Sequence, residues 1–117
     1  HENVIKYYNN LSIFIAVSEI ESFGVSILEA ASCEIPSITS NIGGLTEVNS
    51  HNKTGFIIGV NDPQALAKHI IKLYDNEEMR LKFGKSARKR VLNNFDWEKN
   101  VRQMIKIYNN IYSIYEA

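Results

Sequence analysis

The segment from residue 12 to residue 33 constrains the fold most strongly, because it joins the patterns of a strand, a loop and a helix. Residues 12–18 form an apolar run rich in β-branched and aromatic side chains, which is typical of a strand covered on both faces. A polar stretch then ends at Gly24, and strong helix formers follow in residues 25–33. This order predicts one unit of a parallel α/β sheet in which the first strand is central.

The rest of the chain is expected to alternate short strands with helices. Asp62 is placed as an N-cap with Pro63 at the first helical position, which marks the start of one helix clearly. The basic side chains that follow residue 77 are expected to form a solvated helix face. The expected elements are helices over residues 3–10, 63–75, 77–93 and 97–115, one helical turn at 45–48, and strands at 36–39 and 56–58.

Composition and charge exclude several classes of protein. The 117 residues suffice for one domain or part of one, and thirteen basic residues balance thirteen acidic ones, so nucleic acid is not an expected partner. The longest apolar run, residues 13–17, is far shorter than the roughly 20 residues that span a bilayer. No transmembrane segment is therefore expected.

The cysteine and the histidines carry no expected metal or disulfide site. Cys33 has no second cysteine to pair with, so it is expected in the core, and it fits a reduced cytoplasmic setting. The three histidines are too dispersed in the sequence to suggest zinc ligation. His69 is expected on a helix surface.

Two glutamates around a glycine form the most specific constellation. Glu21 lies in the loop before the predicted helix, and Glu29 lies in its second turn. Backbone N–H groups near Gly24 would stand at the helix N-terminus, where the dipole and the unpaired donors favour a phosphate. A carboxylate on either side could accept hydrogen bonds from sugar hydroxyls. A nucleotide diphosphate sugar has the required shape, whereas the plainer interpretation is a solvent-exposed pair that compensates the dipole.

Residues 18–33 resemble the signature of the group 1, or glycogen-synthase-like, family of retaining GT-B glycosyltransferases. In that signature seven residues separate two glutamates, with Phe-Gly shortly after the first and Glu-Ala at the second. The similarity continues through residues 36–38, 43–48, 54–56, 61–63 and 95–97. The resemblance implies a Rossmann-like parallel sheet flanked by helices, as the C-terminal part of a GT-B lobe that ends in a long amphipathic helix.

The resemblance also assigns roles to individual residues. It implies that Glu21 is catalytic, contacting the transferred sugar near the reacting centre, and that Glu29 binds the nucleotide ribose. No cofactor and no metal are expected. The remaining donor-binding residues would be Ser22, Phe23, Gly24 and Val25.

Three positions depart from the family's usual pattern. Val17 and Thr46 each replace a common proline, and Glu34 replaces a common glycine. None of them removes a carboxylate or Gly24. The turn at Gly43 and Gly44 is equally consistent with a plain tight turn and with a part in shaping the donor pocket, and a structural role is favoured for Glu47.

The family places a basic pair on an earlier segment and an acceptor site, for a glycan or lipid, on an N-terminal lobe. Residues 1–117 are therefore expected to be a partial C-terminal nucleotide-sugar-binding domain that is inactive alone and prone to self-association through side chains such as Tyr112 and Tyr115. The whole enzyme would be cytoplasmic, with peripheral attachment to the inner face of a membrane left open. The alternatives are a non-catalytic α/β interaction module and, less favoured, a phosphoacceptor signalling domain.

Overall fold

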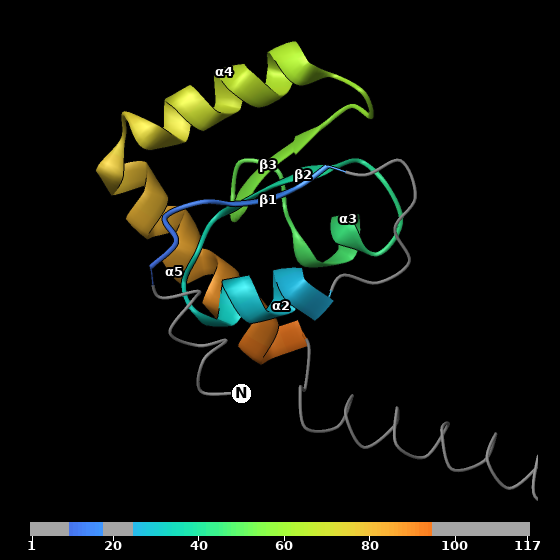
Figure 1. The fold of residues 1–117 in the computed structure, drawn as a ribbon. Helices are drawn as coiled ribbons and strands as arrows, with labels where there is room; N and C mark the ends of the chain where they lie inside the picture. The colour runs from blue at the N-terminus through green and yellow to red at the C-terminus, as the bar shows by residue number, and fades with distance from the viewer. Residues whose placement is uncertain (1–9, 18–24, 95–117) are drawn as a thin grey trace, which may run out of the picture.

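A three-stranded parallel sheet organises the described part of the chain. The computed structural model describes residues 10–17 and 25–94. The strands are ordered β1-β2-β3, and Figure 1 shows this sheet between α4 and α2. The elements are β1 (Phe14–Ala16), α2 (Val25–Ser32), β2 (Ser37–Ser40), α3 (Leu45–Val48), β3 (Gly55–Ile58), α4 (Pro63–Tyr74) and α5 (Glu77–Asn94).

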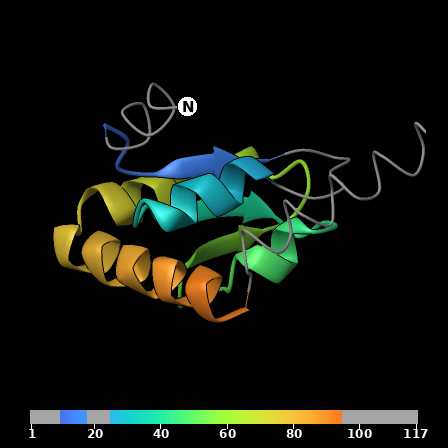
Figure 2. The ribbon, with the colours of Figure 1, turned by 90° about the horizontal axis from the view of Figure 1, so that it is seen from below.

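One face of the sheet packs against α2, α3 and the second half of α5. Phe14 and Ala16 of β1 lie against a cluster of buried aliphatic side chains from these three helices. Figure 2 shows α2 and α5 side by side on this face, as their many mutual contacts require. The cluster consists of Ile27, Leu28, Ala31, Leu45, Val48, Ala87 and Val91.

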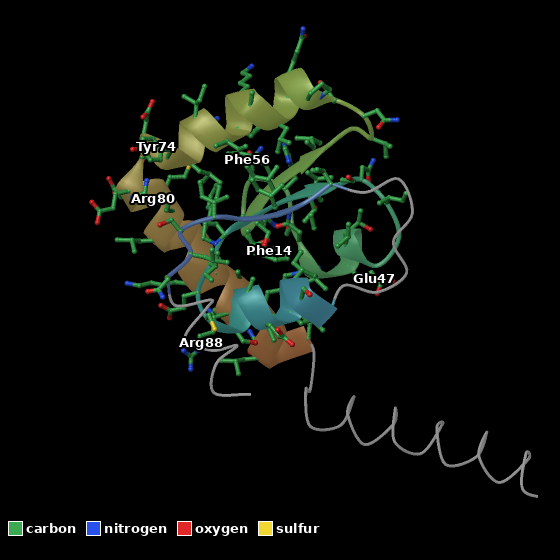
Figure 3. All side chains as sticks on the ribbon, in the orientation of Figure 1. Phe14, Glu47, Phe56, Tyr74, Arg80 and Arg88 are labelled. Atoms are coloured by element: carbon green, nitrogen blue, oxygen red, sulfur yellow. The ribbon has the colours of Figure 1, made fainter. Side chains whose placement is uncertain are left out.

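The other face of the sheet is covered by α4 and the first half of α5. Phe56 is 1% exposed, and its ring lies 5.5 Å from that of Phe83, centroid to centroid. Figure 3 shows Phe56 on the α4 side of the sheet and Phe14 on the α2 side. Side chains alternate between the faces of a strand, so Phe14 and Ala16 of β1 share one core, and Phe56 and Ile58 of β3 share the other.

A close backbone contact joins α5 to the end of α2. A Cβ atom on Gly84 would lie 2.0 Å from the backbone oxygen of Glu34, so only glycine permits this approach. Glu34 has a φ of 62°, in the left-handed region. Its N–H donates to Ala31 O at 3.1 Å, and the N–H of Ile35 donates to Ala30 O at 3.0 Å. These two bonds form a Schellman cap, in which glycine usually occupies the position of Glu34.

The boundaries of the described elements match the sequence predictions within two residues, and the first strand is shorter than predicted at both ends. β1 covers only Phe14–Ala16, and it lies at an edge of the described sheet, where β2 pairs with it on one side. Ile15 is 41% exposed and Val17 is 45% exposed. The sequence predicts a central strand for a complete sheet and an edge position where earlier strands are missing; in the described sheet β1 lies at the edge, and β2, with all four residues buried, is central. An apolar run fills a central place only where strands flank it on both sides.

The helix that begins at Pro63 is capped as predicted. Asp62 accepts a hydrogen bond from the N–H of Ala65 at 3.0 Å. Lys82, Lys85, Arg88 and Lys89 of α5 are exposed and form the predicted solvated face. Arg90, expected on the same face, is half-buried because its guanidinium donates to the carbonyls of Glu47 and Val48. The helices predicted over residues 3–10 and 97–115, with Tyr112 and Tyr115, lie outside the described residues.

Candidate functional site

The carboxyl ends of the strands meet at one edge of the sheet, as the predicted parallel topology requires. Ala16 pairs with Thr39, and Ser40 pairs with Ile58, so the loops after the strands start at the same level. The N–H of Asn41 donates to Ile58 O at 2.9 Å, which ties two of these loops together. Ligands of such sheets bind beyond this edge.

A cavity of about 300 Å³ opens at this edge between the end of β1 and the start of α4. Its walls combine apolar side chains with the polar groups of the loop after β3. Gly59 lies on its rim, and a Cβ atom there would meet nothing within 4 Å. The lining residues are Val17, Ile58, Gly59, Asn61, Asp62, Pro63 and Leu66. A parallel sheet with strands at 12–18 and 56–58 places the loop at residues 59–61 at this edge, but the sequence did not indicate Val17 and Leu66, although Val17 directly follows a strand end.

Glu29 is half-buried in α2, the helix that follows this edge in the chain. No hydrogen bond or ion pair joins its carboxylate to another described residue. Val25 is the first described residue of α2. Glu21, Ser22, Phe23 and Gly24 lie outside the described residues. Their approach to Glu29 stays a prediction from the sequence.

The loop after β2 is a tight turn held in place by α5. Gly43 has a φ of 52°, and its carbonyl accepts a hydrogen bond from the Thr46 hydroxyl at 3.0 Å. The Arg90 guanidinium donates to Glu47 O at 2.8 Å and to Val48 O at 3.0 Å, which satisfies carbonyls at the end of α3. The Glu47 side chain is exposed (Figure 3). Its backbone, rather than its carboxylate, thus has the observed structural contact.

A buried asparagine anchors the segment between α3 and β3. Nothing in the sequence indicated this role. Asn49 is 1% exposed, and its amide donates to Ser37 O, Phe56 O and the Thr39 hydroxyl at 3.0–3.2 Å. Its carbonyl accepts from the Thr54 hydroxyl at 2.8 Å. This network fixes β2 and β3 relative to each other beneath the loops of the candidate site.

Two histidines that are distant in sequence lie close together. The His51 and His69 rings are 6.5 Å apart, and the His69 ring packs 4.6 Å from that of Phe56, centroid to centroid. His69 is half-buried, so the prediction of a plain surface position is wrong. His51 Nδ1 accepts from the N–H of Ile57 at 2.8 Å. Within residues 10–17 and 25–94, no three metal-ligating side chains gather.

Cys33 has the environment of a structural thiol. Burial raises its pKa, and of the two nearby charges Arg88 lowers the pKa while Glu29 raises it. Figure 3 places Arg88 near the end of α2. A raised pKa keeps the thiol protonated at neutral pH, which disfavours a nucleophilic role.

The comparison with protein families decides the assignment of the chain. The model of the family described as glycosyl transferases group 1 matches residues 1–90. This chain belongs to the group 1 glycosyltransferases. The fold agrees, since its parallel sheet flanked by helices matches the Rossmann-like lobes of GT-B enzymes.

Individual relatives support the same family. The chain is 36% identical over 110 residues to N-acetyl-alpha-D-glucosaminyl L-malate synthase from Bacillus anthracis, covering 94% of this chain and 29% of that enzyme. It matches sucrose-phosphate synthase from Thermosynechococcus elongatus with a TM-score of 0.82 and 31% identity, covering 97% of this chain and 29% of that structure. The chain therefore spans less than a third of these relatives.

A third comparison concerns the fold alone. The structure of Anabaena HepE in complex with UDP-glucose matches with a TM-score of 0.79 and 21% identity, covering 92% of this chain and 30% of that one. Among the helices in the described part of the chain, none combines the length and the apolar character that crossing a membrane demands.

Proposed function

We propose that this chain is part of the donor-binding domain of a retaining glycosyltransferase, which moves a sugar from a nucleotide diphosphate sugar to an acceptor hydroxyl. The observation that carries the proposal is Glu29: a half-buried carboxylate with no partner among the described residues, in the helix after the ligand-binding edge of the sheet. Membership of the group 1 family supports this interpretation over a dipole-compensating role.

The donor would extend along the carboxyl edge of the sheet. Glu29 accepts hydrogen bonds from the ribose hydroxyls, and the backbone amides of Phe23, Gly24 and Val25, at the helix N-terminus expected from the sequence, hold sugar hydroxyls or the diphosphate. Glu21 contacts the transferred sugar near its anomeric carbon, with Ser22 beside it. The cavity at Gly59 offers space at the same edge. The HepE complex with UDP-glucose supports a donor of this class, because it shares the fold.

The reaction exchanges one bond at the anomeric carbon for another. The bond from this carbon to the diphosphate oxygen breaks, the acceptor oxygen forms a new bond on the same face, and the acceptor proton ends on the released diphosphate. The nucleophile, a glycan or lipid hydroxyl, would bind to a second lobe. Since the chain covers only 29% of its relatives, transfer by the chain alone is not expected.

A non-catalytic module derived from such a lobe is the competing function. It would keep the sheet and its cores but have no use for a half-buried carboxylate that lacks a hydrogen-bond or ion-pair partner among the described residues. The two functions differ in donor binding and turnover, which are separable measurements.

Calorimetry on the complete enzyme tests the donor site. Glu29→Ala removes hydrogen bonds to a charged acceptor, so donor affinity should fall roughly 10-fold to 100-fold. Glu47→Ala is the matched control, because its carboxylate is exposed and makes no hydrogen bond to another described residue. If Glu29→Ala bound the donor as tightly as Glu47→Ala, the ribose assignment would be wrong.

A further inference from the structure

The charges of this neutral chain are distributed unevenly. Thirteen basic residues balance thirteen acidic ones overall, yet α5 alone contains six basic residues and two acidic ones. Both of its acidic residues, Glu77 and Glu78, lie in the first turn. The rest of α5 is therefore a strongly cationic surface, whereas the remainder of the chain has seven basic and eleven acidic residues.

Part of this surface is concave. A cavity of about 470 Å³ lies between α5 and the turn that precedes β3, within the size range of small-ligand sites. It is lined by four cationic side chains, while hydroxyl and amide groups such as that of Ser86 supply further donors, and no acidic residue lines it. The cations are Lys53, Lys82, Lys89 and Arg90.

The cavity is separate from the candidate donor site. Its turn, at residues 50–54, comes before β3, whereas the donor edge lies after the strands. Glu29 does not line this cavity, and the cavity at Gly59 has no lining residue in common with it. The proposed transfer reaction thus leaves these cations without a role.

Two contacts hold the walls of the cavity in place. Arg90 is fixed by its hydrogen bonds to the carbonyls of Glu47 and Val48. The Thr54 hydroxyl bonds to Asn49 and accepts from the N–H of Ser50 at 2.7 Å, which fixes the turn that presents Lys53. A fixed guanidinium with lysines on flexible stems can surround a compact anion without rearrangement of the backbone.

We propose that this cavity binds a phosphate ester. A phosphoryl group is compact, has up to two negative charges and offers several acceptor oxygens, which matches four cations and uncharged donors in one hollow. The phosphate can come from a lipid headgroup or from a soluble phosphorylated ligand. The proposed phosphate site uses other residues than the proposed donor site, so an experiment can refute one proposal and leave the other standing.

The test compares two variants of this chain with equal charge. Lys82→Gln with Lys89→Gln removes two cations of the cavity, and Lys68→Gln with Lys85→Gln removes two exposed lysines outside it. All four side chains are exposed, so both variants should fold, as circular dichroism would show. The probes are glycerol 3-phosphate, followed by amide NMR shifts, and phosphatidylglycerol vesicles, followed by sedimentation.

The proposal predicts that the cavity variant loses roughly 10-fold in affinity and that the control variant keeps the affinity of the parent chain. Shifts should concentrate at Ser86 and Lys53. Binding of glycerol 3-phosphate alone assigns a soluble ligand, and binding of vesicles alone assigns a headgroup. Equal losses in both variants would show attraction by charge alone and overturn the proposal, as would the absence of binding to both probes.

Discussion

Replacement of Glu34 by glycine should stabilise the chain, although most core-adjacent substitutions destabilise proteins. Glu34 occupies the C′ position of the Schellman cap after α2 with a φ of 62°. A residue with a Cβ atom is strained in this region, whereas glycine adopts it readily. The Glu34 side chain is exposed and forms no hydrogen bond to another described residue, so its removal costs no described contact.

The expected gain follows from two opposing terms. Relief of the left-handed conformation contributes about 1–2 kcal/mol. The greater freedom of glycine in the unfolded chain offsets about 0.5–1 kcal/mol of this. The free energy of unfolding should therefore rise by about 0.5–1 kcal/mol, which corresponds to roughly 2–6 °C in Tm for a chain of this size.

Urea unfolding followed by circular dichroism measures the change, with Glu78→Gly as the matched control. Glu78 lies in the first turn of α5, where the same substitution should lower stability by about 1 kcal/mol because glycine disfavours a helix. The reasoning predicts opposite signs for one chemical change at two positions. If Glu34→Gly destabilised the chain as much as Glu78→Gly, the account of the cap would be refuted.

Two further substitutions test the packing that supports the site. Gly84→Ala should destabilise the chain by about 1–3 kcal/mol, because the new Cβ would lie 2.0 Å from Glu34 O. Lys85→Ala, the control on the same helix, should be nearly neutral. A rise in stability for Gly84→Ala would show that helix propensity outweighs the close contact. Asn49→Leu should cost about 3 kcal/mol or more in urea unfolding, because it leaves buried carbonyls and hydroxyls without their partner, and a cost below about 1 kcal/mol would contradict the role of this network.

Local signals in the sequence were enough to locate most elements. Asp62 and Pro63 marked the start of α4, as its N-cap and first helical residue. These signals act through neighbouring residues and need no tertiary contact. The sequence showed that Glu34 replaces a common glycine. Only the structure showed the positive φ that favours glycine at this position.

Features that depend on distant contacts could not be predicted in this way. The position of β1 in the sheet depends on which strands pair with it, and the apolar run alone does not specify them. The packing of His69 on Phe56 brings together two elements, and Arg90 reaches carbonyls more than 40 residues away in the chain. The candidate site was predicted only as far as its local pattern extends: Glu29 lies on the predicted helix, while the cavity at Val17 and Leu66 depends on the fold.

The most direct test of the central claim is a comparison of turnover and donor affinity for Glu21→Gln in the complete enzyme. A carboxylate that acts near the reacting centre contributes mostly in the transition state. The proposal predicts that kcat falls at least 100-fold while the donor Kd, measured by calorimetry, changes less than about 5-fold. Unchanged turnover would remove Glu21 from the site and contradict the assignment of this chain to the catalytic part of a glycosyltransferase.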